Sequence, residues 1–269
     1  MNAVLVKNLK VTPLKVESEN RAIMRPYFGN SENILVGEEA TIDFDVEVAV
    51  SGAAGTVPGY GTLLRACGMA EVISAGVSVT YNPISAAFES ITIYCYRAGL
   101  LYKFTGCRGN VKIAFAAKKI PEFSFSFVGQ YVPVTDVAIP GGAVYTIFQT
   151  PKASLPANTG TLTFNAVAVQ MAALTLDIGN QITHARWMNA ESLDIMDRQS
   201  KGSITVQAPP IATIDYFTLV RNATTSAFTL THGTVAGQKV TIAAPKANLI
   251  DNAEAEFEGA LAYTMNIEF

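Results

Sequence analysis

Residues 109–131 read Gly-Asn-Val-Lys-Ile-Ala-Phe-Ala-Ala-Lys-Lys-Ile-Pro-Glu-Phe-Ser-Phe-Ser-Phe-Val-Gly-Gln-Tyr, and residues 237–263 read Gly-Gln-Lys-Val-Thr-Ile-Ala-Ala-Pro-Lys-Ala-Asn-Leu-Ile-Asp-Asn-Ala-Glu-Ala-Glu-Phe-Glu-Gly-Ala-Leu-Ala-Tyr. Both run from a glycine through an apolar strand, a lysine-containing bend and an alternating strand to Phe-x-Gly, and end at a tyrosine. A chain that builds one unit twice can place both copies in equivalent positions of an assembly. The repeat therefore favours an architectural role over a chemical one.

The composition narrows the possible classes of protein. At 269 residues, the chain can bury one large core or two ordinary ones. Apolar residues make up 49% and charged residues 15%, and the mean hydropathy is +0.27. No run approaches the ~18 uncharged apolar residues of a membrane helix, so we expect no membrane association. We expect part of the apolar surface to be buried against copies of the chain; a monomer with large cores is the alternative.

The charge and the cysteines point to a protein without a nucleic-acid site or disulfides. The net charge of -3 lacks the basic excess typical of nucleic-acid binders. Cys67, Cys95 and Cys107 lack the spacing of metal ligands, and the N-terminal residues do not resemble a signal peptide. We therefore expect synthesis in a reducing cytoplasm with free thiols.

Most segments alternate polar and apolar residues with a period of two, which is typical of half-buried strands. The alternation is clearest in residues 41–48, 122–127, 203–207 and 253–258. Turn signals punctuate the chain at Ala98-Gly99, Arg108-Gly109-Asn110, Pro140-Gly141-Gly142, 157–160, Ile178-Gly179-Asn180 and Ala236-Gly237. The sequence predicts a mainly antiparallel β-protein.

Two segments without this alternation predict short helices, residues 60–70 and 211–223. The second follows Pro209-Pro210, a natural helix start. Each lies between upstream strands and a downstream strand-bend-strand unit. We therefore predict two tandem β-sandwich or barrel modules, residues 1–135 and 165–269, each with one short helix, joined by a breaker-rich linker at residues 136–164.

A small, uncharged loop precedes the first predicted helix and is too long for a tight hairpin. It is either a solvated loop or an arm that becomes ordered against a neighbouring subunit. The candidate inter-subunit loop comprises Ser51, Gly52, Ala53, Ala54, Gly55, Thr56, Val57 and Pro58.

The stretch Gly61-Thr-Leu-Leu-Arg-Ala-Cys-Gly-Met-Ala-Glu71 resembles the Leu-Leu-Arg-Ala-Cys-Gly segment of tail tube proteins from long-tailed bacteriophages. The resemblance covers nearly the whole chain in order, and Cys107 departs from it where many relatives carry a small residue. Further matching pieces are Arg25–Glu32, Val79–Pro83, Ser90–Tyr94, Gly106–Gly109, Leu174–Asn180, Thr231–Thr234 and Ala243–Lys246.

The resemblance implies a structural protein of the virion tail, synthesised in the host cytoplasm. Rings of such proteins stack into a hollow tube around a tape-measure protein, and DNA later passes through without specific binding. Tail-tip and tail-terminator proteins are the other implied partners. A tube of a phage-derived secretion or bacteriocin device is the nearest alternative, and a carbohydrate-binding β-sandwich adhesin is a more distant one.

Rings in this family hold six modules, so two modules in one chain imply homotrimeric rings with pseudo-sixfold symmetry. Hexameric rings remain the alternative if the second module lies outside the wall.

Two acidic stripes are candidates for the lumen. Three exposed like charges on one strand face repel one another by a few tenths to ~1 kcal/mol per pair. A negative wall would repel DNA phosphates, whereas a solvated strand face is the ordinary interpretation. The candidate lumen-lining residues are Asp43, Asp45 and Glu47 in one stripe and Glu254, Glu256 and Glu258 in the other.

The sequence offers no catalytic constellation. His184 and His232 are the two histidines, and neither lies near a nucleophile elbow or within a metal-ligand pattern. Residues 106–110 lack the Lys-Ser/Thr ending of a phosphate loop and predict a hairpin turn instead. We therefore expect no enzyme activity, metal or cofactor.

Overall fold

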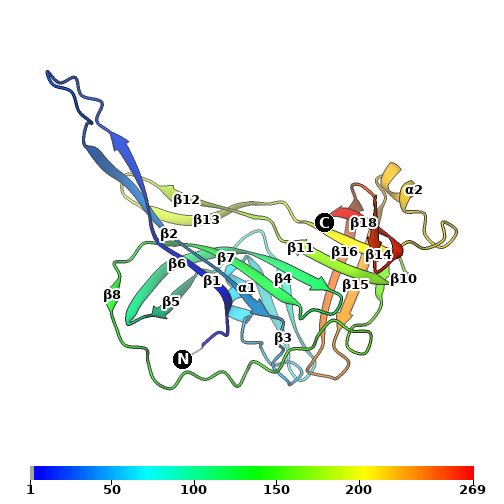
Figure 1. Cartoon of the computed structure of the whole chain (residues 1–269). Helices are drawn as coiled ribbons and strands as arrows, with labels where there is room; N and C mark the ends of the chain where they lie inside the picture. The colour runs from blue at the N-terminus through cyan, green and yellow to red at the C-terminus, as the bar shows by residue number, and fades with distance from the viewer. Residues whose placement is uncertain (1–2) are drawn as a thin grey trace.

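The computed structural model describes residues 3–269 as an antiparallel β-protein with two short helices (Figure 1). One fourteen-stranded sheet forms the body, and two separate hairpins accompany it. The elements are β1 (Lys7–Asn20), β2 (Asn33–Glu47), α1 (Gly61–Ala66), β3 (Met69–Ser74), β4 (Ser78–Pro83), β5 (Ile91–Arg97), β6 (Leu100–Ala116), β7 (Glu122–Gln130), β8 (Thr135–Asp136), β9 (Leu162–Phe164), β10 (Val167–Val169), β11 (Met171–Asp177), β12 (Asn180–Arg186), β13 (Glu191–Arg198), β14 (Lys201–Gln207), α2 (Tyr216–Arg221), β15 (Thr225–His232), β16 (Val240–Leu249), β17 (Ala253–Phe257) and β18 (Ala260–Glu268).

The large sheet follows the order β1-β2-β7-β6-β11-β14-β18-β16-β15-β9-β10, with β5 and β8 on β6 and β17 on β18. The two separate hairpins are β3–β4 and β12–β13. Every strand pair named here is antiparallel, so the predicted mainly antiparallel fold is confirmed.

Two hydrophobic cores lie on this sheet. The first is built around an aromatic stack in which the ring of Phe44 lies 5.8 Å from Phe125 and 5.9 Å from Phe127, and α1 adds buried leucines to it. The second contains Leu174 and Ile204 and is joined by Tyr216 of α2. The predicted effect of the alternating sequence is therefore confirmed: the apolar face of an alternating strand packs into a core, and its polar face is exposed to solvent.

The same strand order surrounds both cores. In the first half, β2 pairs with β1 and β7, and β7 pairs with β6. In the second half, β14 pairs with β11 and β18, and β18 pairs with β16 and β17. α1 follows β2 and α2 follows β14. Where the halves meet, β6 pairs with β11, so one sheet runs through both.

The sequence repeat and this strand order do not coincide along their whole length. Gly129 of the first Phe-x-Gly lies inside β7. Gly259 of the second lies in the turn between β17 and β18, at a φ of 81°. The strand order is therefore the firmer correspondence between the two halves.

The turn predicted at Arg108-Gly109-Asn110 is wrong, because these residues continue β6. Gly106 adopts a left-handed φ of 61° at a register shift, which absorbs the irregularity within the strand. Gly109 lies so close to the Phe127 ring that an added Cβ would sit 2.4 Å from it. The glycines here serve a bulge and a close contact instead of a chain reversal.

Both predicted helices exist but are shorter than the predicted segments. α1 ends at Ala66, and β3 begins at Met69. α2 begins only at Tyr216, because the residues just after Pro210 form a separate turn and Asp215 caps the helix by accepting a hydrogen bond from the Thr218 amide at 3.0 Å.

β1 and β2 continue beyond the sheet as a two-stranded arm, which we define as residues 15–39. In this part of β2, pairing is with β1 alone, and β7 begins to pair only at Ala40. The arm projects far from the body at the upper left of Figure 1, and the hairpin β12–β13 lies along its base. Its tip exposes Met24 and Phe28 almost fully. The alternation pattern did not predict this arm.

We predict that Phe127→Ala lowers the free energy of unfolding by about 3–5 kcal/mol, because it opens a cavity inside the aromatic stack. Urea denaturation measures the loss. Ser124→Ala on the same strand faces solvent and serves as the control, with an expected change within about 0.5 kcal/mol. Equal effects of the two substitutions would show that the stack is not the centre of the first core.

Candidate lumen face and assembly surfaces

The first acidic stripe lies on the face of β2 that points away from the core. Its carboxylates are not bare. Asp43 accepts a hydrogen bond from Ser126 at 2.6 Å, and Asp45 accepts one from the Asn8 side chain at 2.7 Å. Glu47 forms an ion pair with Lys7 at 2.5 Å. Local donors therefore offset the repulsion that the bare sequence implies.

Lys7 bridges two carboxylates that face each other across strands. Glu47 and Glu122 are direct cross-strand partners, and the Lys7 Nζ lies 2.5 Å from the first and 2.8 Å from the second. The hydrogen bond from Lys7 to Glu122 is the main cause of a raised lysine pKa, and the hydrogen bond to Glu47 adds to it. Without the ammonium group, two like charges would face each other directly, which is unfavourable in a sheet.

Six charged residues of alternating sign and one serine form a row across this face, one residue per strand. Cross-strand pairing links the members in sequence from β1 to β18. We call this the transverse row: Lys7, Asp45, Ser124, Lys112, Asp177, Lys201 and Glu268. The polar face is thus a balanced pattern of charges and not a uniformly negative wall.

Asp177 and Lys112 join the row across the junction of β6 and β11. The Lys112 Nζ lies 3.2 Å from the Asp177 carboxylate, and Asn110 donates a second hydrogen bond to it at 2.7 Å. Burial opposes the ionisation of Asp177, but the hydrogen bonds from Asn110 and Lys112 outweigh it and lower its pKa. The polar face is therefore continuous through the middle of the chain.

The second acidic stripe lies on the other face of the sheet. Glu254 of β17 is the cross-strand partner of Tyr263, whose ring packs against the second core and lies 5.7 Å from Phe217 of α2. Glu256 follows on the same face, and Glu258, in the turn, pairs with Lys118. A lumen formed by one face of this sheet can include only one of the two stripes.

The candidate loop at residues 51–58 is folded against its own chain. The Ser51 hydroxyl contacts the carbonyl oxygens of Ala53 at 3.1 Å and Thr56 at 2.9 Å. Gly55 packs on the backbone of the β3–β4 turn, and Gly237 packs on the loop from the other side. These contacts lie within one chain, and contact of the loop with another subunit stays a prediction.

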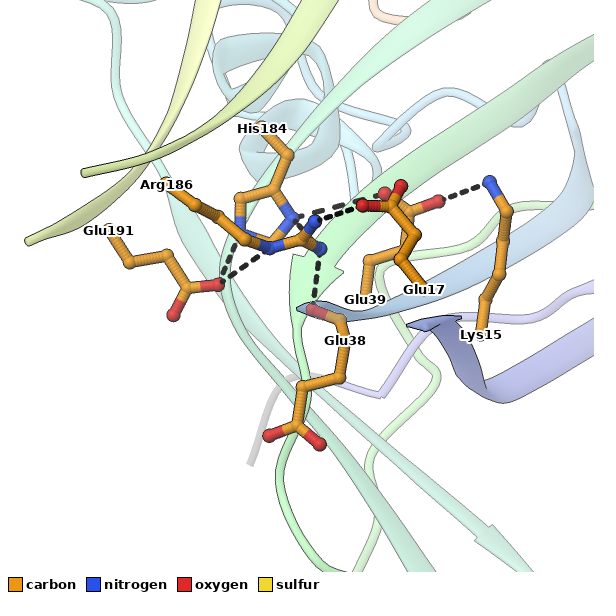
Figure 2. A network of polar contacts seen from close by, with 7 residues as sticks. All are labelled: Lys15, Glu17, Glu38, Glu39, His184, Arg186 and Glu191. Atoms are coloured by element: carbon orange, nitrogen blue, oxygen red, sulfur yellow. Dashed lines mark hydrogen bonds and ion pairs between the residues drawn. The ribbon is translucent and has the colours of Figure 1, made fainter. Parts of the chain in front are cut away.

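Arg186, at the end of β12, ties the second half of the chain to the base of the arm (Figure 2). Its guanidinium donates to Glu17 of β1 at 3.0 Å and to the Glu38 carbonyl of β2 at 2.8 Å. It also lies 3.6 Å from Glu191 of β13. Because the planar guanidinium offers several donors in a fixed geometry, one side chain can hold all three elements.

His184 lies beneath this guanidinium, with a side chain only 5% exposed. Its Nε2 lies 2.5 Å from Glu191, and its Nδ1 lies 3.1 Å from Arg186 and 3.8 Å from Glu39. Lys15 bonds the other side of Glu39 at 2.6 Å, and this hydrogen bond lowers the pKa of Glu39. Sequence reasoning missed the cluster because its members come from four strands in distant parts of the chain.

His232, the last residue of β15, has a structural role. It is buried, its Nδ1 lies 2.9 Å from the Thr159 hydroxyl and its Nε2 lies 3.1 Å from the Lys152 carbonyl. Burial lowers its pKa, although the Lys152 contact acts in the opposite direction. The ring therefore anchors the irregular segment before β9 to β15.

Other reactive groups form no site. Cys67, Cys95 and Cys107 are free and buried, and burial raises the pKa of Cys107 to about 12. Within residues 3–269 there is no group of three or more His, Cys, Asp or Glu residues arranged to hold a metal ion. In the same range, no helix has the length and apolar character needed to cross a membrane.

The fold is that of a mainly antiparallel β-protein with one large sheet. The family model described as phage tail tube protein matches residues 8–267, nearly the whole chain. The chain therefore belongs to the phage tail tube protein family and is a non-enzymatic structural component of the tail tube in the virion. The resemblance drawn from the sequence is confirmed. A search of curated proteins found no match.

We predict that Lys7→Met destabilises the protein by about 1 kcal/mol, because Glu47 and Glu122 then repel each other across strands. The loss should shrink at high salt, which screens exposed charges. Urea denaturation at low and high ionic strength measures both effects. Adding Glu122→Gln should restore most of the stability, and a failure to do so would contradict the bridging role of Lys7.

We predict that Arg186→Ala increases hydrogen exchange in residues 15–19 and 34–38 by about tenfold, equivalent to about 1.4 kcal/mol. Arg186→Lys should recover only part of the protection, because an ammonium group cannot reproduce the forked contacts. Hydrogen-exchange mass spectrometry of the purified chain measures the change. Arg221→Ala on exposed α2 is the control, and unchanged exchange at the arm base in the Arg186 variants would contradict the assignment.

Proposed function

We propose that three copies of this chain form one ring of the tail tube, with residues 1–135 and 165–269 acting as two tandem modules and residues 136–164 as their linker. Six modules then surround the lumen with pseudo-sixfold symmetry. Two separate cores and a shared strand order support this reading. The pairing of β6 with β11 is the observation that carries the proposal, because one continuous sheet through both halves is what two modules in one wall would require. In a hexameric ring with the second module outside the wall, the two modules would not need to share one sheet through β6 and β11.

We propose that the polar face bearing the transverse row lines the lumen. Asp43, Asp45 and Glu47 would then face the passing DNA, and Glu254 and its stripe would face away. On this face Lys7 and Lys112 are each paired with carboxylates. The ion pairs of these two lysines reduce the positive charge available to phosphates, so we expect the DNA to pass without specific binding.

A hollow tube with two ends needs one partner inside it and one at each end. We propose that the tube encloses a tape-measure protein and meets a tail-tip complex at one end and a terminator at the other. A secretion or bacteriocin tube shares this wall, and DNA-filled particles would distinguish the virion role. An adhesin is disfavoured because Trp187, the only tryptophan, lies at the tip of β12–β13, and the hollow that it lines with Leu35 and Val36 contains no second aromatic residue from residues 3–269.

We predict that electron microscopy of the concentrated protein, seeded with tail-tip complexes, shows hollow rings and stacked tubes. Mass measurement should give three chains per ring, while the projected outline should look sixfold. This combination follows from two similar modules in each chain. The three-chain mass is the decisive number because the outline alone fits both stoichiometries.

Rings of six chains would retain the tube role and overturn the proposal that both modules lie in the wall. Compact monomers in the presence of seeds would overturn self-assembly by this mechanism. Lys7→Met and the wild-type chain form a matched pair for this assay, because the substitution alters the polar face without touching either core.

A further inference from the structure

Two hairpins occupy corresponding places in the two halves of the chain. The arm lies between the sheet-forming parts of β1 and β2, and the hairpin β12–β13 lies between β11 and β14. The strand pairs β1–β2 and β11–β14 correspond in the shared strand order. Near its tip, each hairpin also has an arginine opposite a glutamate, Arg21 with Glu32 in the arm and Arg186 with Glu191 in β12–β13. The two hairpins are therefore similar insertions in different surroundings.

The arm by itself has little to fix its direction. Between its tip and Ala40, β2 pairs only with β1 within residues 3–269. The register of this pairing shifts between Thr12 and Lys15, and again between Glu17 and Ser18. Bulges bend a strand pair, and an isolated two-stranded ribbon is marginally stable. A contact close to these shifts can therefore decide in which direction the arm points.

The hairpin β12–β13 is fastened to the first half at its root. The buried Asn180 side chain donates to the carbonyl oxygens of Cys67 at 2.6 Å and Gly109 at 3.0 Å. Arg198, its cross-strand partner, donates to the Asn180 side-chain oxygen at 2.9 Å and to the Gly68 carbonyl at 3.0 Å. These hydrogen bonds hold the root against the end of α1 and against β6.

A second contact fastens the middle of this hairpin. Arg108 of β6 donates to the Asp194 carboxylate of β13 at 2.5 Å and also to the Leu193 carbonyl. The same guanidinium donates to the Phe88 carbonyl at 3.2 Å. Hydrogen bonds between charged groups are stronger than those between neutral groups. The hairpin β12–β13 is thus held to the body along its length, unlike the arm.

The tip of β12–β13 meets the arm next to the register shifts. Arg186, which bonds Glu17 and the Glu38 carbonyl, passes directly over the backbone of Gly37. A Cβ atom added to Gly37 would lie 2.5 Å from the Arg186 Nη1 and 2.8 Å from its Cζ. The end of a flexible side chain is the part that would have to move. One methyl group at residue 37 would therefore displace the guanidinium without requiring a change in the fold.

We propose that β12–β13 is a brace that fixes the direction of the arm before the chain meets another copy, and that this preorganisation favours tube assembly. The exposed tip, with Met24 and Phe28, is then presented in one orientation. A segment that is already ordered loses less conformational freedom when it binds. The proposal rests on self-assembly of the tail tube and does not depend on the number of chains in a ring.

Distance measurements on the unassembled full-length chain test the brace directly. Met24→Cys with Val77→Cys provides exposed labelling sites at the tip of the arm and in the turn between β3 and β4. The three native cysteines are buried and should remain unlabelled. Pulsed electron paramagnetic resonance of the spin-labelled chain should give one narrow distance distribution. Adding Gly37→Ala or Arg186→Ala should abolish the single narrow peak.

Two further variants make this measurement specific. Gly141→Ala adds the same methyl group where an added Cβ meets no heavy atom of residues 3–269 within 4 Å, so the narrow peak should remain. Gly37→Ala combined with Arg186→Ala should match Arg186→Ala alone, because the methyl group acts only through the guanidinium. Urea denaturation checks that each variant is folded.

Assembly of the same variants tests the second part of the proposal. Tubes seeded with tail-tip complexes are sedimented over a series of protein concentrations. Gly37→Ala and Arg186→Ala should raise the concentration needed for tube growth by about tenfold, because the arm must then be ordered during binding. Gly141→Ala should assemble like the wild-type chain.

The outcomes separate the brace from the tube role. A narrow peak that persists in both Gly37→Ala and Arg186→Ala would overturn the brace. Loss of the peak with unchanged tube growth would overturn the contribution of preorganisation to assembly. A wild-type chain that forms no tubes even when seeded would overturn self-assembly and with it the assembly role of the arm, while the distance measurement would still decide whether β12–β13 holds the arm.

Discussion

The pairing of β6 with β11 is the constraint on which the rest of the structure depends. β6 contributes Val111 to the first core and Phe115 to the second, and five antiparallel pairs connect it to β11. Because one strand serves both cores, the two halves share a single sheet and are not free to rotate as separate domains. The central ladder therefore joins the strands of both halves in one antiparallel sheet.

The polar face is stabilised by charges of opposite sign on neighbouring strands and not by any single ion pair. An exposed pair contributes little alone, typically below about 1 kcal/mol. Lys7 and Lys112 matter because each separates or links carboxylates at fixed positions of the sheet. If this face lines the lumen as proposed, its charges would keep it hydrated, and the carboxylates beside Lys7 and Lys112 would weaken the attraction of these lysines for phosphate. The face does not form the uniformly negative surface that the acidic stripes suggest when strands are considered singly.

The arm shows how the two halves cooperate outside the sheet. It is formed by the first strands of the chain, yet Arg186 and His184 from the second half hold its base. This arrangement links the direction of the arm to the β12–β13 hairpin. Its exposed tip, with Met24 and Phe28, is the kind of apolar surface that a monomer rarely leaves uncovered.

The sequence by itself determined the mainly β fold, the buried faces of its clearly alternating strands and the family. Alternation at residues 41–48 and 122–127 is a local property, so side chains on one face reach a core whatever the neighbouring strand is. Order along the chain sufficed for the resemblance to tail tube proteins. Only the tertiary structure decided that Arg108–Asn110 continues a strand, that the two acidic stripes lie on opposite faces, and that Arg186 meets Glu17. Each depends on which distant strands pair and in what register, and that choice is made by packing across the whole sheet, which no local pattern encodes.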